Sequence, residues 1–364
     1  MNILKYSACA WLLLLGLASC SDDEPATPVI EPPVGTPSTT AYVLNQGSFY
    51  SGIDGTLDRI DLLDDTYTSS IFAAVNGQSL GDSPQDGVAY GSRLYIAMYG
   101  SNLIWVVDRQ TARIVRQIQT NEPEGICAAG GCVYVSNNDG YVTRIDTLSL
   151  DITGHLAVGP NPAHLVASGG YLYVSISDGF NSAGGYANGF RVAKLRIADG
   201  AFEAVKDIPV GMNPGPIQAD SGGNVFVVCR GDYGATKPLI QKITPDDAVA
   251  DFAPGSNIAV WNTTLYAVYN YTDWTTSPTQ STVTYAAYRT TDGTVLDADL
   301  LPADHLPASP IDIDVHPGNG DIYIGTQPSA YDYTAPGYVY RYTSTGQYVC
   351  RYNAGVYPCA VIFS

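Results

Sequence analysis

Apolar strands separated by glycine-rich turns recur along most of the chain. Each repeat opens with a proline, continues through small or apolar residues to a turn, and enters a second, more apolar strand. The three clearest copies open at Pro84, Pro123 and Pro162. Two more strands complete a copy. The third ends at an Asp, as in residues 103–108, and the fourth alternates apolar and polar residues, as in residues 112–118. This pattern predicts half-buried β-strands and no amphipathic helix in this part of the chain.

The spacing of the repeats predicts the architecture. Counted from the second strand, the copies begin at residues 94, 133, 172, 225, 265 and 322, which are 39, 39, 53, 40 and 57 residues apart. A four-stranded unit of about 40 residues is typical of a β-propeller blade, and the longer intervals indicate inserted loops. The internal copies therefore predict six blades.

The two ends of the repeated region supply a seventh copy. Residues 42–45 match the second strand of a blade without a proline-led strand before it, and residues 357–363 form a proline-led strand without a second strand after it. Together they complete one blade and leave no open sheet edge around the ring. We therefore predict an all-β, seven-bladed propeller over residues 41–364, with four-stranded blades, closed by pairing of the C-terminal strand with the N-terminal strands.

The first forty residues differ from the repeats. Lys5 precedes an apolar run over residues 10–18 that is too short for a membrane span and typical of a signal peptide. The run ends in Leu-Ala-Ser-Cys, which resembles a bacterial lipobox, so we predict a lipoprotein signal peptide over residues 1–19 and lipidation of Cys20. Residues 20–40 then form a Pro- and Thr-rich flexible tether. Its acidic start resembles the signal that sends lipoproteins of Bacteroidota to the outer face of the outer membrane.

The charge balance argues against whole classes of partner. The chain carries 17 Lys and Arg against 35 Asp and Glu, a formal net charge of −18. Nucleic acids and anionic lipid surfaces attract basic patches, so we predict no nucleic-acid partner and contact with the membrane through the lipid anchor alone. The 27 Tyr residues, against 8 Phe and 4 Trp, are the conspicuous excess.

Five cysteines remain after Cys20, and neither their odd number nor their spacing indicates a metal site. Cys127 and Cys132 flank a short hairpin turn. The sequence leaves open whether these two form a disulfide or remain free thiols.

Several stretches resemble known propellers. The phrase Gly-Gly-x-Leu-Tyr-Val-Ser at 169–175 and the Val-x-x-Ile-Asp strand at 142–146 resemble YncE-type bacterial seven-bladed propellers. Five stretches resemble, more narrowly, the BtuG surface lipoproteins of Bacteroidota: residues 42–48, 80–86, 141–146, 158–162 and 320–326. The BtuG resemblance implies a lipid-anchored, cell-surface protein of the outer membrane that needs no cofactor. It also implies that the protein binds cobalamin or another corrinoid and hands it to a TonB-dependent outer-membrane transporter of the BtuB type.

Propeller geometry selects one face for ligand binding. The loops that lead into the first strands and those that join second to third strands emerge together around the central channel, and here they are rich in aromatic, Asn and Gln residues. Such rigid rings mixed with amides suit a large, flat, partly apolar ligand, a description that fits both corrinoids and oligosaccharides. The candidate ligand-binding residues are Phe49, Gln85, Tyr99, Asn137, His164, Phe180, Tyr186, Arg230, Tyr233, Tyr271, Trp274, Tyr331, Tyr333 and Tyr357.

Signals of catalysis are weak. No Ser or Cys lies in a recognisable nucleophile motif, and His164 with Glu124 is the only pair that suggests lyase chemistry. Asp312, Asp314 and His316 alternate along one strand before a turn. We interpret them as ordinary polar residues of a β-hairpin and its turn, and not as a metal site. We therefore predict a binding protein without catalytic or metal residues. A glycan-binding propeller and a protein-interaction propeller remain the alternatives.

Overall fold

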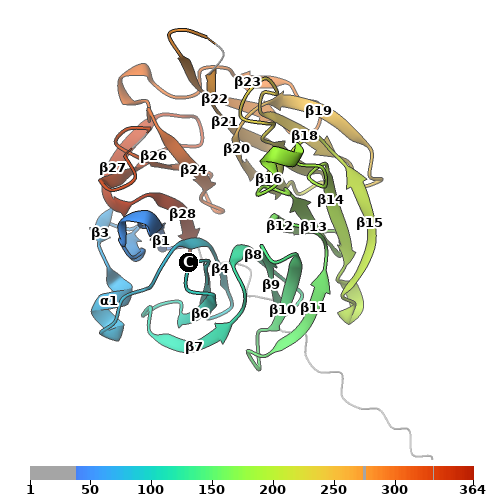
Figure 1. Ribbon diagram of the computed structural model, residues 1–364. Helices are drawn as coiled ribbons and strands as arrows, with labels where there is room; N and C mark the ends of the chain where they lie inside the picture. Colours follow the sequence, from blue (N-terminus) through green and yellow to red (C-terminus); the bar gives the residue numbers. More distant parts are fainter. Residues whose placement is uncertain (1–37, 274–275, 331) are drawn as a thin grey trace, which may run out of the picture. The chain divides into compact units, whose positions relative to one another are not determined.

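The computed structural model describes residues 38–273, 276–330 and 332–364. Within these residues, 28 strands form seven antiparallel sheets of four strands each. Figure 1 shows the sheets placed around a common centre as the blades of a propeller, which confirms the predicted fold. No helix in these ranges is long and apolar enough to cross a membrane.

One blade combines the two ends of the described chain. From the centre outward, its strands are β28 (Pro358–Phe363), β1 (Thr40–Asn45), β2 (Thr56–Asp61) and β3 (Thr66–Thr68). β28 pairs antiparallel with β1, and Val43 lies opposite Val361. The predicted closure of the ring by the C-terminal strand is therefore present.

Each of the other six blades uses four consecutive strands. They are, blade by blade: β4 (Pro84–Tyr90), β5 (Arg93–Met98), β6 (Leu103–Asp108) and β7 (Ile114–Gln119); β8 (Pro123–Ala129), β9 (Cys132–Asn137), β10 (Tyr141–Asp146) and β11 (Ile152–Ala157); β12 (Pro162–Ser168), β13 (Tyr171–Ile176), β14 (Arg191–Arg196) and β15 (Glu203–Pro209); β16 (Pro214–Ala219), β17 (Val225–Cys229), β18 (Leu239–Ile243) and β19 (Val249–Pro254); β20 (Asn257–Trp261), β21 (Thr264–Asp273), β22 (Gln280–Arg289) and β23 (Val295–Asp297); β24 (Pro310–Val315), β25 (Ile322–Thr326), β26 (Pro336–Tyr342) and β27 (Tyr348–Val356). The first strands of neighbouring blades contact one another all around the ring.

Five short helices lie in the connections and were not predicted from the sequence pattern. They are η1 (Phe49–Ser51), α1 (Ile71–Asn76), η2 (Ser182–Gly184), η3 (Ala198–Gly200) and η4 (Ala303–His305) among the described residues. The only α-helix in these ranges, α1, has six residues and buries a single side chain, Phe72. These helices fill loops and leave the all-β architecture unchanged.

The second strand of every blade carries a buried aromatic residue at the same position. These residues are Tyr42, Tyr95, Tyr134, Tyr173, Phe226, Tyr266 and Tyr323. The hydroxyls of Tyr42 and Tyr266 donate hydrogen bonds to backbone oxygens of the next blade, those of Arg109 and Ser344. Burial of a large apolar side chain contributes about 1.5–3 kcal/mol. These seven buried aromatic residues therefore help to join adjacent blades, and the six tyrosines among them account for part of the tyrosine excess.

Candidate functional site

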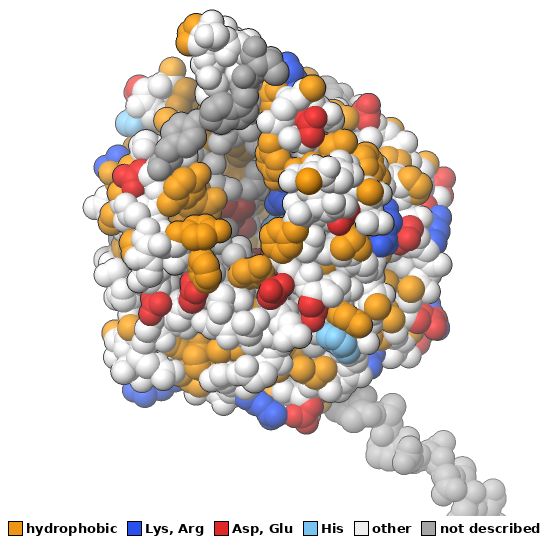
Figure 2. Space-filling model, in the orientation of Figure 1, with side chains coloured by type: hydrophobic (Ala, Val, Ile, Leu, Met, Phe, Trp, Pro, Cys, Tyr) orange, Lys and Arg blue, Asp and Glu red, His pale blue; other side chains and the backbone are white. Residues whose placement is uncertain are grey.

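Two contiguous cavities lie at the centre of the propeller. The mouth cavity, of about 530 Å³, is lined by loops that join second to third strands and by residues near the starts of first strands. The channel, of about 250 Å³, is lined largely by the first strands themselves. Gln46, Gln85, Glu124 and Tyr357 border both cavities. Figure 2 shows a hollow in this face, rimmed mainly by hydrophobic side chains.

A repeated backbone turn shapes this region. Five residues that precede a strand-opening proline have positive φ, between 40° and 57°: Ser83, Glu122, Asn161, Asn213 and Tyr357. Residues other than Gly rarely adopt this conformation, and in folded proteins such residues concentrate at functional sites. Because the turn recurs in five blades, it brings the next residues, such as Gln85 and Glu124, to the centre of the ring.

Aromatic side chains form the rim of the mouth cavity. Phe49 is 60% exposed, Phe180 73% and Tyr333 52%, although each carries a large apolar surface. Tyr333 stacks on Tyr357 with 6.3 Å between ring centroids. Phe49 meets Tyr50 edge to face at 5.4 Å. An exposed aromatic cluster around a hollow is typical of a ligand or partner site.

Polar side chains line the inner part of the mouth cavity. Gln46, Gln85 and Asn138 supply side-chain amides that can both donate and accept hydrogen bonds. The Asn138 amide donates to the Glu124 carboxylate at 2.5 Å. Burial raises the pKa of Glu124, although the positive charge of Arg230 opposes the shift. The cavity therefore offers apolar faces at its rim and hydrogen-bonding groups deeper down.

Carboxyl groups dominate the channel. Asp86 accepts hydrogen bonds from the backbone amides of Gly87 at 2.7 Å and Ile126 at 3.0 Å, and burial raises its pKa to about 7. Asp312 and Asp314 lie two residues apart on β24, and their carboxyl groups interact. Burial raises the pKa of both groups, and the Asp312 charge raises that of Asp314 further.

Backbone and amide donors hold the Asp312–Asp314 pair in place. The Asn257 amide donates to Asp312 at 2.9 Å, and the Val361 backbone N–H donates to Asp314 at 2.5 Å. Val361 belongs to β28, so the closing strand and the channel carboxyls depend on each other.

Arg230 is the only Lys or Arg among the described residues that line the channel. Its guanidinium lies over Gly215, where even a Cβ atom would approach the Arg230 Cζ to 2.4 Å. Arg230 Nη2 lies 3.5 Å from Nε2 of His164. Burial and the Arg230 charge lower the pKa of His164 to about 3, so the imidazole is neutral at physiological pH and Nε2 can accept a hydrogen bond from the Arg230 guanidinium.

The structure brings eight of the fourteen candidate ligand-binding residues to these cavities. Those that line the mouth cavity are Phe49, Gln85, Tyr99, Phe180, Tyr333 and Tyr357. His164 and Arg230 line the channel. The face chosen from propeller geometry is therefore the face at which the channel opens. Trp274 and Tyr331 lie outside the described residues, as does Cys20.

Four candidates line neither cavity. Asn137 is fully buried, and its amide donates to Thr120 Oγ1 and to the Asn121 backbone oxygen. Tyr186 is buried. The Tyr271 hydroxyl donates to the Gly234 backbone oxygen at 2.5 Å, which supports the loop that carries the exposed Tyr233.

Sequence reasoning missed several cavity residues. Asn138 and Tyr50 are chain neighbours of the candidates Asn137 and Phe49, and their side chains line the mouth cavity. The interpretation of Asp312 and Asp314 as ordinary polar residues of a hairpin is incomplete, because both line the channel. The available signal was their place in a proline-led strand, because Pro310–Asp312 has the same spacing as Pro84–Asp86. The turn interpretation holds for His316, whose Nδ1 accepts the backbone N–H groups of Gly318 and Asn319.

The cysteines and carboxylates do not form a metal centre in the part of the chain that the structure describes. Cys127, Cys132, Cys229, Cys350 and Cys359 are free thiols. Cys127 pairs with Tyr134 across the hairpin, and Cys132 pairs with Ala129, so the two thiols flanking this turn do not face each other. Burial raises the pKa of the Cys127 thiol and that of the channel-lining Cys359.

Comparison with known proteins supports the fold. No protein-family model matches the chain, and a search of curated proteins finds no match. A quinoprotein alcohol dehydrogenase-like protein from Bacteroides thetaiotaomicron superposes with a TM-score of 0.64 at 16% identity, covering 90% of this chain and 78% of the other. Hydrazine synthase from Kuenenia stuttgartiensis superposes with a TM-score of 0.62 at 15% identity, covering 77% of this chain and 89% of the other. At these identities the likeness establishes the propeller and no particular activity.

Proposed function

We propose that this protein is a surface receptor of the BtuG type that binds cobalamin or another corrinoid at the mouth cavity. The observation that carries the proposal is the composition of that cavity, in which exposed aromatic rings surround side-chain amides. A corrinoid has a broad, nearly flat ring with amides at its edge. Aromatic faces suit the ring, and Gln46, Gln85 and Asn138 suit the peripheral amides, because amides pair reciprocally.

The size of the cavity limits how such a ligand is held. At about 530 Å³ the mouth cavity encloses only part of a corrinoid. The ring would rest on the rim aromatics Phe49, Phe180 and Tyr333, with its amide side chains directed toward the channel. Binding spread over several loops requires neither a protein ligand to cobalt nor a catalytic residue, and the proposal accordingly describes a non-enzymatic receptor.

The proposal includes the place of the protein in the cell. Cys20 would carry a lipid anchor in the outer membrane, residues 21–40 would space the propeller from it, and a TonB-dependent transporter would receive the ligand. Cys20→Ala should release a folded protein from the membrane fraction, because the anchor lies outside the propeller core. Resistance of the protein to protease on intact cells, with cleavage of the isolated protein, would contradict surface exposure.

A binding experiment tests the central claim. Purified protein is mixed with cyanocobalamin, desalted and scanned for the absorbance of the bound corrinoid, and titration calorimetry then measures affinity and stoichiometry. We expect coloured protein with one corrinoid per chain. Colourless protein with no heat of binding would refute the corrinoid proposal, and binding to a sugar array would then favour the glycan-binding alternative.

A further inference from the structure

A second groove lies beside the mouth cavity and shares part of its wall. This side groove has a volume of about 520 Å³ and lies between the η1 loop, which joins β1 to β2, and the loop that joins β25 to β26. Ser48, Tyr50 and Tyr333 border both the side groove and the mouth cavity. A ligand in the mouth cavity can therefore extend into the side groove without leaving the protein surface.

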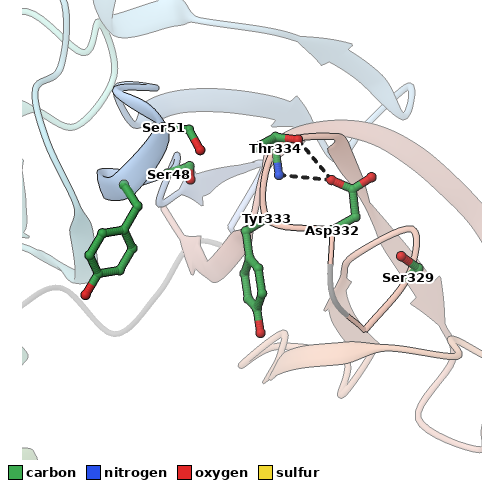
Figure 3. Close-up of a pocket in the computed structure, with 7 residues that line it drawn as sticks. Ser48, Ser51, Ser329, Asp332, Tyr333 and Thr334 are labelled. Carbon is green, nitrogen blue, oxygen red and sulfur yellow. Dashed lines mark hydrogen bonds between the residues drawn. The ribbon is translucent and has the colours of Figure 1, made fainter.

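Hydroxyl groups line the side groove. Figure 3 shows Ser48 and Ser51 on one loop and Ser329 and Thr334 on the other, with Tyr333 between them. Ser48 is only 8% exposed, yet its hydroxyl makes no capping bond with η1, and no partner for it is found among the described residues. The Ser48 hydroxyl borders the groove and is therefore available to a ligand or to water.

Asp332 sets the charge of the side groove. Its Oδ1 accepts the backbone N–H groups of Thr334 at 3.0 Å and Ala335 at 2.9 Å, and the Thr334 hydroxyl at 3.1 Å (Figure 3 shows the Thr334 bonds). These donors hold the pKa of Asp332 below its usual value, so the carboxylate is charged at neutral pH. No Lys or Arg is among the described residues lining the groove, which therefore disfavours anions and favours hydroxyl donors.

We propose that the side groove binds an uncharged sugar ring, as an arm of the ligand whose flat part occupies the mouth cavity. The proposal rests on the proposed function for the mouth cavity and adds a separate subsite to it. Sugar hydroxyls both donate and accept, which matches the serine hydroxyls and the second oxygen of Asp332. The faces of Tyr50 and Tyr333 provide the amphipathic surface on which the C–H groups of a sugar pack.

Two corrinoids that differ in this arm provide the first test. Cobalamin carries in its nucleotide arm a ribose that is joined to a phosphodiester and to a base, whereas cobinamide lacks this ribose and base. The phosphate would have to lie outside the side groove, so the Asp332→Asn change, and not the comparison alone, reports on the ribose. We expect the protein to bind cobalamin at least about tenfold more tightly, since hydrogen bonds to a charged group contribute about 1.5–3 kcal/mol. Asp332→Asn should abolish most of this preference by weakening cobalamin and not cobinamide. Equal affinities in the wild type, or equal losses in the variant, would overturn the side-groove proposal.

The Asn substitution preserves the loop, because its side-chain oxygen can still accept the bonds now made to Oδ1. Asp64→Asn is the matched control. Asp64 also accepts a backbone N–H at its own turn, that of Thr66 at 3.0 Å, but it lies between β2 and β3 and lines neither the groove nor the cavities. It should leave both affinities unchanged.

A second test does not depend on corrinoids. Saturation-transfer NMR with methyl ribofuranoside, methyl glucoside and methyl galactoside reports weak sugar binding directly. If no corrinoid binds but a glycoside signal is present and disappears in Asp332→Asn, the proposed function fails and the sugar subsite stands. If corrinoids bind without discrimination and no glycoside signal depends on Asp332, the corrinoid proposal stands and the sugar subsite fails. If no corrinoid and no glycoside binds, both fail.

Discussion

The mouth cavity and the channel share four residues, yet they are built in opposite ways. The mouth cavity is made by loops whose aromatic side chains project into solvent with few protein partners. The channel is made by the first strands, and its carboxyls are fixed by backbone and amide donors. The channel residues are therefore part of the blades, whereas residues that line the mouth cavity can be substituted without altering the blades. Substitutions in the channel should change stability first, and substitutions at the mouth should change binding first.

Removal of β28 should have the largest effect, because this strand contributes to both regions. Deletion of residues 357–364 exposes the edge of β1, removes the buried Val361 and Ile362, and takes away the Val361 donor of Asp314. We expect aggregation or a melting temperature lower by at least about 10 °C, measured by circular dichroism.

A shorter deletion provides the control for this prediction. Ser364 lies beyond β28, and its side chain bonds only to Arg109. Its removal should lower the melting temperature by a few degrees at most. A stable propeller without β28 would show that the composite blade is dispensable.

Loss of two rim aromatics should separate the mouth cavity from the fold. Phe49→Ala and Phe180→Ala each remove a ring that is largely exposed in the free protein and would be buried by ligand. Each change should weaken corrinoid binding by about 1–3 kcal/mol, or about ten- to two-hundredfold, and shift the melting temperature by less than about 2 °C. Calorimetry of the single and double variants tests this expectation.

Leu148→Ala is the matched control for the rim. Leu148 is 81% exposed and lies in the turn between β10 and β11, at the opposite end of the strands. It should affect neither binding nor stability. Weakened binding in this variant, with normal binding in the double rim variant, would mean that the ligand uses the other face.

The channel should make stability depend on pH. Asp86, Asp312 and Asp314 have raised pKa values, so the folded protein holds these protons more tightly than the unfolded chain. Their stabilising contribution is present below the ordinary Asp pKa near 4 and decreases as pH rises through about 7, the folded pKa of Asp86. His164, whose pKa is lowered to about 3, opposes this trend between pH 5 and its ordinary pKa near 6.5. We therefore expect urea unfolding to give a free energy lower by about 1–2 kcal/mol at pH 8 than at pH 5.

Asp314→Asn should reduce this pH dependence and stabilise the protein at pH 8, by about 1–3 kcal/mol. The amide keeps an acceptor for the Val361 N–H and removes one charge from the Asp312–Asp314 pair. An unchanged pH profile would show that this pair does not control the stability of the folded state. Asp64→Asn, at an exposed turn, should leave the profile as it is.

The fold was predictable because every blade must pack against its neighbours in the same way. A buried aromatic such as Tyr95 or Tyr173 recurs wherever two blades pack, and a proline such as Pro84 or Pro162 opens the first strand in six of the seven blades. These requirements leave a period in the sequence. The split between residues 42–45 and 357–363 was predictable for the same reason, since each half lacks what the other supplies.

The candidate site was only partly predictable, because loops carry no period. Asn137 and Asn138 are adjacent and chemically identical, yet backbone geometry buries the first in hydrogen bonds and places the second at the mouth cavity. Tyr271 is as aromatic as Tyr333, but its hydroxyl supports a neighbouring loop. The role of Asp312 and Asp314 in the channel was not predictable, because these β24 residues meet Asp86 of β4 and Glu124 of β8 only when separate blades are brought together.

The meeting of β28 and β1 also determines how the mouth is presented. The Ser364 backbone N–H donates to the Thr40 oxygen at 2.8 Å, and the Ser38 oxygen lies 3.3 Å from His316 Nε2 in the turn between β24 and β25. The described chain therefore enters the propeller at the end opposite the mouth, one strand length or about 20 Å away. A probe attached at Ser38 would therefore lie at the face opposite the mouth cavity and leave that cavity open.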